Sequence, residues 1–251
     1  MPDLLVTYPG GSTLEHTTVV AVAPVADRTL FAVARTPCHP ESPRWPDQPA
    51  DRCTLEGAGR SFAIECFEGY LSDERLQIGP PEPTAEALRC VVHRGPADLP
   101  VAVGTAVTLR VDEGYRQALS RSHSLCHLVS LALNAALADA WRKDPGASDS
   151  LGNPDFDKLA IRSSVIGEDG SLDTYRVGKH LRKAGFSAAA LDDPAALAQR
   201  VEQIAGAWLA SRPRVSVTPG VSALDERRVW SCELAQGVAS FPCGGTHVER
   251  L

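Results

Sequence analysis

The first 110 residues carry their apolar positions in short β-branched runs that are broken by Gly, Pro and Asp. Runs of this length that end at turn residues predict strands joined by tight turns. The clearest runs lie at 17–35, 60–71, 87–95 and 105–112. Between the first two runs, residues 36–57 are dense in proline and polar side chains, which indicates an ordered loop or a linker. We therefore expect a β-rich domain over residues 1–111.

The pattern changes to a helical period after about residue 114. Apolar side chains recur three and four positions apart, which predicts an amphipathic helix over 115–141. They are Leu125, Leu128, Val129, Ala132, Leu133, Ala136 and Leu137, and a narrower polar face carries Ser120, His123, His127, Ser130 and Asn134. Residues 158–177 then predict a strand pair with a glycine turn. Helices over 174–185 and 193–211 and strands in 213–220, 227–235 and 237–245 complete an α+β domain over 112–251.

Composition narrows the class of protein. A chain of 251 residues with 43% hydrophobic and 22% charged residues can bury a substantial core. We find no apolar run that predicts a membrane span and no basic, then apolar, leader, so we expect a cytoplasmic protein. Seven cysteines at irregular spacing do not predict a disulfide framework, which agrees with a reducing compartment.

The net charge of −6 argues against a protein that coats nucleic acid by charge alone. A local basic cluster nevertheless lies at 176–183, where Arg176, Lys179, His180, Arg182 and Lys183 gather. Two interpretations stay open for this cluster. It either contacts a nucleic acid or forms an ordinary solvated helix face.

Two short motifs supply candidate metal ligands. Positions i and i+4 share one face of a helix, so His123 and His127 can direct both imidazoles to one point. Taken alone, this pair fits a metal site or two ordinary histidines equally well. The segment CGGTH adds Cys243 and His247, and its glycines allow a close approach of the backbone and a turn through positive φ. Together the four side chains form a complete donor set for Zn²⁺.

The segments RSHSLCHL and FPCGGTHV resemble the zinc motifs of the alanyl-tRNA synthetase editing domain and its free-standing AlaX relatives. SSVIGED is similar to a strand and turn of that family, and residues 34–57 are similar to its glycine-rich stretch. The resemblance implies a β-barrel-like N-terminal domain joined to an α+β zinc-binding domain. It also implies hydrolysis of the ester of mischarged tRNA, with aminoacyl-tRNA as the partner and Zn²⁺ as the cofactor.

Carried over residue by residue, the resemblance implies roles for seven side chains. The zinc ligands would be His123, His127, Cys243 and His247. Thr36 matches a threonine that senses a substrate hydroxyl, whereas Gln48 and Asp51 match polar residues of the glycine-rich loop. Trp45, which stands where the family has glycine, would either stack on an adenine or cover the loop.

Other residues and functions keep two interpretations. Cys126 is a nucleophile or, more in keeping with its direction on the helix, a core residue. Cys38 and His39 are a nucleophile with its base or two loop residues. Arg44, Trp45 and Asp47, which stand where the family has consecutive glycines, also fit an aminoacyltransferase that passes the amino acid from tRNA to a small-molecule amine. A non-catalytic zinc-stabilised module that binds tRNA or protein is a third possibility, because structural zinc sites have four protein ligands.

Overall fold

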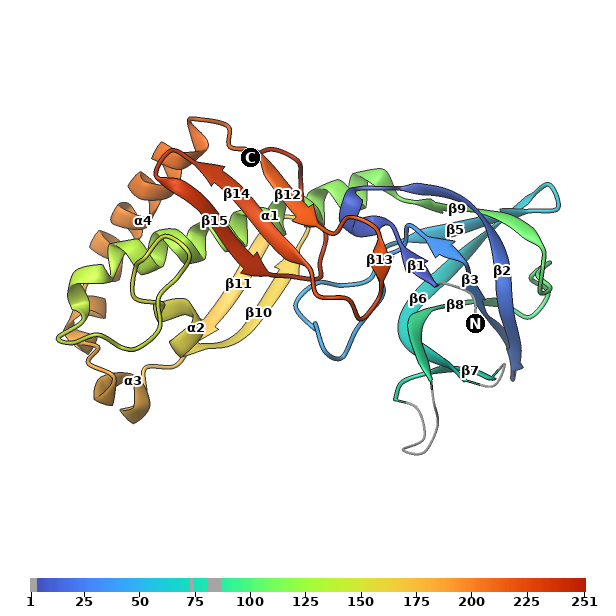
Figure 1. The fold of residues 1–251 in the computed structure, drawn as a ribbon, viewed down its shortest axis with the longest axis horizontal. Coiled ribbons are helices and arrows are strands. Elements are labelled where there is room, and N and C mark those ends of the chain that lie inside the picture. The colour runs from blue at the N-terminus through green and yellow to red at the C-terminus, as the bar shows by residue number, and fades with distance from the viewer. Residues whose placement is uncertain (1–3, 73–74, 81–86) are drawn as a thin grey trace.

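The computed structural model describes residues 4–72, 75–80 and 87–251. Strands dominate the chain before the first α-helix (Figure 1). They are β1 (Leu5–Val6), β2 (Leu14–Val25), β3 (Arg28–Val33), β4 (Arg35–Thr36), β5 (Cys53–Gly57), β6 (Arg60–Ser72), β7 (Arg75–Ile78), β8 (Leu88–Pro96) and β9 (Ala106–Val111). The four runs that the sequence predicts as strands coincide with β2–β3, β6, β8 and β9, so these predictions are confirmed.

Seven of these strands form one sheet in the order β5-β9-β2-β3-β8-β6-β7. A further pairing of β5 with β6 closes six of them into a ring. Side chains alternate in and out along the strands, as the pleat requires. In β9, for example, Val107, Leu109 and Val111 are buried whereas Ala106 and Arg110 are exposed. The inward side chains fill a core inside the ring.

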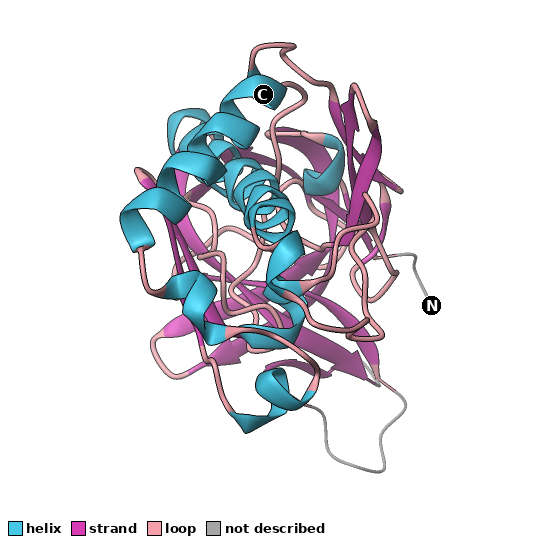
Figure 2. Cartoon of the chain, turned by 90° about the vertical axis from the view of Figure 1, so that its left-hand side faces the viewer, coloured by secondary structure: helices cyan, strands magenta, loops and turns pink. Residues whose placement is uncertain are grey.

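The rest of the chain is mixed helix and strand. Its elements are α1 (Glu113–Ala136), α2 (Phe156–Ala160), β10 (Ile161–Gly167), β11 (Gly170–Tyr175), α3 (Lys179–Lys183), α4 (Pro194–Leu209), β12 (Val215–Thr218), β13 (Ser222–Ala223), β14 (Val229–Leu234) and β15 (Gly237–Pro242). Figure 1 and Figure 2 show that the helices of this part of the chain gather at the end of the molecule away from the strand ring. The long helix α1 is central: α4 and the β10–β11 hairpin pack against it, and a core cluster joins it to the sheet β12-β14-β15.

Backbone pairing crosses the predicted boundary near residue 111. Strand β13 pairs with β1, with Ser222 opposite Val6 and Ala223 opposite Leu5. The proline-rich segment is an ordered loop as far as Arg52, but its predicted loop character is wrong for Cys53–Gly57, which form β5. Its Glu41 forms a bridge with Phe67 of β6, and the amide of Ile166 donates to the carbonyl of Asp47 at 2.7 Å. This loop therefore links the strand ring to the β10–β11 hairpin.

The predicted α+β class is confirmed, and so are the hairpin and the helix over 193–211. The helix predicted over 174–185 is wrong in its extent, because only Lys179–Lys183 is helical. Tyr175 instead pairs with Ile161 in the hairpin, and Gly185, with a φ of 110°, follows the helix end. None of the helices in the described ranges combines the length and apolar character needed to cross a bilayer.

Candidate metal centre

Helix α1 carries two of the predicted ligands. It begins where the Asp112 carboxylate accepts a hydrogen bond from the amide of Tyr115 at 3.0 Å, which caps the helix N-terminus. His123 and His127 follow one turn apart, and their ring centroids are separated by 4.8 Å. The structure thus brings the two imidazoles to one side of the helix, as the i, i+4 spacing predicts.

The polar stripe of α1 faces the interior of the protein. Ser124 and Asn134 are fully buried, and His123 is 2% exposed, whereas the apolar Val129 is 43% exposed. Burial of polar groups is tolerated when each one is hydrogen-bonded. Asn134, for example, donates to Asp155 at 3.2 Å and accepts from the amide of Asp157 at 2.9 Å. Hydrogen-bonding partners on other elements therefore allow the polar face of α1 to be buried along with apolar side chains such as Leu128 and Ala132.

The other two predicted ligands follow strand β15. The amide of Cys243 donates to the carbonyl of Arg228 at 3.1 Å, which places the CGGTH segment over α1. At Gly245 the backbone passes so close to His123 that an added Cβ would lie 2.4 Å from the ring carbon Cε1. At Gly244 the nearest atom to an added Cβ lies at 3.9 Å. The predicted close approach is therefore confirmed at Gly245, but the predicted positive φ is wrong for both glycines.

The four predicted ligand atoms converge. One donor atom from each of His123, His127, Cys243 and His247 lies within 4.8 Å of all the others. The Cys243 Sγ is 3.5 Å from His123 Nε2 and 3.3 Å from His247 Nε2. A tetrahedral zinc ion with Zn–S about 2.3 Å and Zn–N about 2.0 Å separates such S and N ligands by about 3.5 Å. The donor set matches this spacing.

Hydrogen bonds fix which imidazole nitrogens face the centre of the set. The Gln48 Oε1 accepts from the amide of Thr246 at 3.0 Å, which orients the Gln48 amide, and it lies 2.7 Å from His123 Nδ1. Because a carbonyl oxygen only accepts, His123 carries its proton on Nδ1 and keeps the Nε2 lone pair free. A hydrogen bond from the ring nitrogen that faces away from the ion is typical of histidines that bind metals.

The same logic applies on the other side of the set. The Ser124 hydroxyl donates to the carbonyl of Ser120 at 2.8 Å, so it accepts from His247 Nδ1 at 3.1 Å. The Nε2 of His247 is then also unprotonated. The Nε2 of His127 is buried and has no hydrogen-bond partner in the described part of the chain. A bound metal ion would satisfy this nitrogen, so the residues present fit a metal ion.

Burial sets the charge of the donor set. It lowers the pKa of His127 well below the ordinary value, and the nearby His123 lowers it further. Burial likewise lowers the pKa of His247 and raises the pKa of the Cys243 thiol to about 12. Without a cation these groups are neutral near pH 7. A divalent cation would compensate the charge of a Cys243 thiolate.

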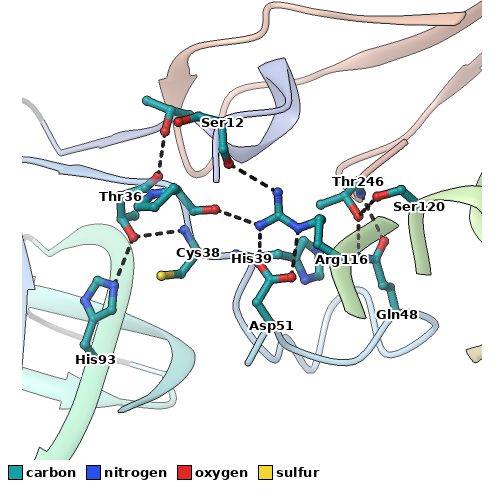
Figure 3. Close-up of polar contacts among 12 residues, drawn as sticks. Ser12, Thr36, Cys38, His39, Gln48, Asp51, His93, Arg116, Ser120 and Thr246 are labelled. Atoms are coloured by element: carbon teal, nitrogen blue, oxygen red, sulfur yellow. Dashed lines mark hydrogen bonds and ion pairs between the residues drawn. The ribbon is translucent and has the colours of Figure 1, made fainter. Parts of the chain in front are cut away.

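The three other predicted site residues have different surroundings (Figure 3). Gln48 contacts the donor set through its hydrogen bond with His123, and its Nε2 donates to the hydroxyl of Thr246 at 2.8 Å. Asp51 instead pairs with the buried Arg116, whose Nε donates to it at 2.8 Å. Thr36 turns its hydroxyl to His93 Nε2 at 3.0 Å, away from Gln48. The structure thus brings only Gln48 to the metal ligands.

Asp47, one of the residues that stand where the family that the sequence resembles has glycines, is a further residue at this centre. Its Oδ2 lies 3.5 Å from His123 Nε2, and its side chain is 28% exposed. A cavity of about 600 Å³ is lined by Asp47, Gln48, Pro46, Phe67 and Val165. The adjacent Gln48 was the available sequence signal. A carboxylate therefore stands between the donor set and an open cavity.

The remaining candidates lie around the centre or far from it. Trp45 is 47% exposed, and its ring lies beside Gly244. Cys126 is buried with Leu119 and Ile166, as the core interpretation predicts, and its thiol lies 3.3 Å from Asp173. The basic side chains Arg176, Lys179, Arg182 and Lys183 are exposed on and before α3, at the end of the molecule away from the strand ring.

Comparison with known proteins gives a partial likeness. No protein-family model matches the chain. Over 82 residues the chain is 38% identical to the alanine–tRNA ligase of Acidothermus cellulolyticus. The match covers 31% of this chain and 9% of the ligase, so the chain spans only a small part of that relative. The likeness indicates a region related to alanyl-tRNA synthetase and gives no family assignment.

Proposed function

We propose that this protein is a zinc-dependent enzyme that acts on the aminoacyl ester of aminoacyl-tRNA and hydrolyses mischarged tRNA. The observation that carries the proposal is the convergence of His123, His127, Cys243 and His247. Asp47 and Gln48, which lie against His123, also line an open cavity. The partial likeness to an alanine–tRNA ligase supports tRNA as the substrate class. The proposal includes a β-barrel-like domain over 1–111 and a zinc-binding domain over 112–251.

The chemistry is the addition of water to an ester. Water attacks the ester carbonyl carbon, the bond to the ribose oxygen breaks, and the products are a free amino acid and tRNA with a free 3′-terminal ribose. Bound Zn²⁺ supplies a Lewis acid beside the carbonyl. Asp47 accepts the proton of the attacking water, since its carboxylate adjoins both the donor set and the cavity. Gln48 keeps the His123 ring in the ligating orientation.

Recognition of the tRNA would use residues outside the donor set. Trp45 offers a half-exposed indole beside Gly244, and such a ring can stack on the terminal adenine. Arg176, Lys179, Arg182 and Lys183 are exposed cations that suit contacts with phosphates. Thr36 and Asp51 would act through the loop rather than on the substrate, because their polar atoms bond to other protein groups.

A deacylation assay tests the proposal. Zinc-loaded protein is mixed with tRNA(Ala) charged with serine, glycine or alanine, and the loss of the ester is followed with time. We expect hydrolysis of a mischarged species, a fall of at least about 100-fold in Asp47→Asn, and little change in Glu41→Gln. Glu41 lines the same cavity and is exposed, so it is a matched control. If none of these aminoacyl-tRNAs is deacylated, the proposed hydrolase activity is wrong.

One observation favours a second candidate function. The donor set contains four protein ligands, and closed sets of this kind are typical of structural zinc. A zinc-stabilised module that binds tRNA would hold charged tRNA without consuming the ester, so binding without hydrolysis would identify it.

The aminoacyltransferase is tested in the same assay by adding candidate amines. A new amide detected by mass spectrometry would identify transfer.

A further inference from the structure

Three cysteine thiols meet inside the strand ring, apart from the donor set described above. The Sγ atoms of Cys38, Cys53 and Cys66 all lie within 4.8 Å of one another. Their residues are at most 4% exposed, and none of the three is in a disulfide. They come from three separate segments: the start of the proline-rich loop, the start of β5 and the middle of β6. Tertiary structure, not local sequence, brings them together.

The surroundings of the three thiols are mostly apolar. They belong to one core cluster with Phe31, Leu55 and other buried side chains. His93 faces Cys66 across the β6–β8 pairing, and Figure 3 shows its ring near the Cys38 side chain. Thiols are weak hydrogen-bond donors and acceptors, so three of them gain little from one another as hydrogen-bonding groups. As thiolates they are strong ligands for soft cations.

We propose that Cys38, Cys53 and Cys66 form a second metal site, which binds a thiophilic d¹⁰ cation, Zn²⁺ or Cu⁺. With metal–sulfur bonds of about 2.3 Å, tetrahedral or trigonal coordination separates sulfurs by about 3.8 to 4.0 Å. The observed limit of 4.8 Å accommodates this spacing. On binding, each thiol loses its proton to solvent and each thiolate donates an electron pair to the ion.

A metal explains the cluster better than a disulfide does. A disulfide would join two of the thiols, leave the third unused and need an external oxidant. All three sulfurs are shielded from solvent, which slows such an oxidation. Three convergent thiols from separate segments are, in contrast, a complete trigonal ligand set, or a tetrahedral one that lacks a single donor.

Occupation of this site would affect the proposed catalytic centre through the loop. Cys38 and Cys53 flank residues 39–52, which include Asp47 and Gln48. Cys66 lies in the middle of a 13-residue strand. An ion bound by all three thiolates would hold both ends of the loop against β6. We therefore expect slower amide hydrogen exchange in residues 39–52 when the second ion is bound.

Metal counting by elemental analysis tests the proposal on the full chain, which is loaded with Zn²⁺ or with Cu⁺ under reducing, oxygen-free conditions. We expect two ions per wild-type chain with at least one of the two metals, and the metal that fills the second site identifies its preference. Cys66→Ala should bind one ion and Cys243→Ala should bind one. Cys90→Ala should still bind two, because Cys90 is equally buried but belongs to a different core cluster.

X-ray absorption at the metal edge keeps the test decisive if a variant does not fold. Two zinc ions in the wild type should average two sulfur ligands each, whereas a single ion in the donor set has one. A Cys243→Ala chain should give three sulfurs around its remaining ion. The proposal would be overturned if the wild-type chain bound one ion when loaded with Zn²⁺ and also one ion when loaded with Cu⁺. A disulfide between any two of the three cysteines would overturn it as well. Neither result depends on whether the protein deacylates tRNA.

Discussion

The contact between Gly245 and His123 gives a quantitative prediction about the metal centre. A Cβ at Gly245 would lie 2.4 Å from His123 Cε1 and 2.6 Å from Gln48 Oε1. Ordinary contact begins at 3.4 Å, so the imidazole or the backbone must move by at least about 1 Å. Metal–ligand bonds tolerate errors of only about 0.2 Å. Gly245→Ala should therefore remove His123 from the donor set or strain the whole site.

The expected size of this effect follows from ligand geometry. Disturbing only the side chain that hydrogen-bonds to a ligand weakens metal binding by about 10- to 100-fold, and Gly245→Ala disturbs both the ligand His123 and its partner Gln48. We expect zinc affinity to fall by at least about 100-fold. At equal free zinc, a fall of 100-fold lowers the metal-dependent gain in unfolding free energy by about 2.7 kcal/mol.

Competition with a chromophoric chelator measures the zinc affinity, and urea unfolding with and without zinc measures the stabilisation. Gly244→Ala is the matched control, because its added Cβ would meet Trp45 at 3.9 Å, an ordinary contact distance. We expect Gly244→Ala to retain wild-type zinc affinity within about threefold. Equal zinc affinities for the two variants would refute the reasoning.

Three more predictions concern protons and charges. Because burial raises the pKa of Cys243 to about 12, zinc binding at the four-ligand donor set should release one proton, and in the Cys66→Ala chain the affinity of this set should rise about tenfold per pH unit from pH 7 to 9 in chelator titrations. Asp51→Asn should cost about 3 kcal/mol in urea unfolding by leaving Arg116 buried without its partner, whereas Glu65→Gln, at the surface, should cost less than about 1. Burial lowers the pKa of His39 from 6.5 to about 3, so below pH 6.5 the unfolded chain binds a proton that the folded chain does not, and the free energy of unfolding falls as the pH drops. His39→Gln removes this titration, so it should reduce the slope of the unfolding free energy against pH, measured in urea, by up to about 1.4 kcal/mol per pH unit.

Local pattern predicted most of the secondary structure. The strand runs and the period of α1 follow from the alternation of apolar residues, which depends only on neighbours in the sequence. The strand Cys53–Gly57 inside the predicted loop is one exception, and the helix predicted over 174–185 is another. Its first residues pair with β10 instead, because the strand ladder offers Tyr175 a partner that no local propensity reports.

Motif spacing likewise predicted the metal-centre candidates but not their surroundings. The i, i+4 histidines and the CGGTH segment indicated four ligands, and the structure brings these side chains together. No local pattern indicated that Gln48 orients the His123 ring or that Ser124 orients the His247 ring. Those contacts span 75 and 123 positions of the chain, so only the fold creates them.

The amino-acid sequence by itself determined the α+β class, most element positions and the types of donor available for a metal. It did so because side-chain periodicity and ligand chemistry are local properties. The tertiary structure decided that the polar stripe of α1 is buried, that Asp47 adjoins the donor set and that three distant cysteines meet in one core. These results depend on which surfaces pack together, and packing is set by contacts between residues far apart in the chain.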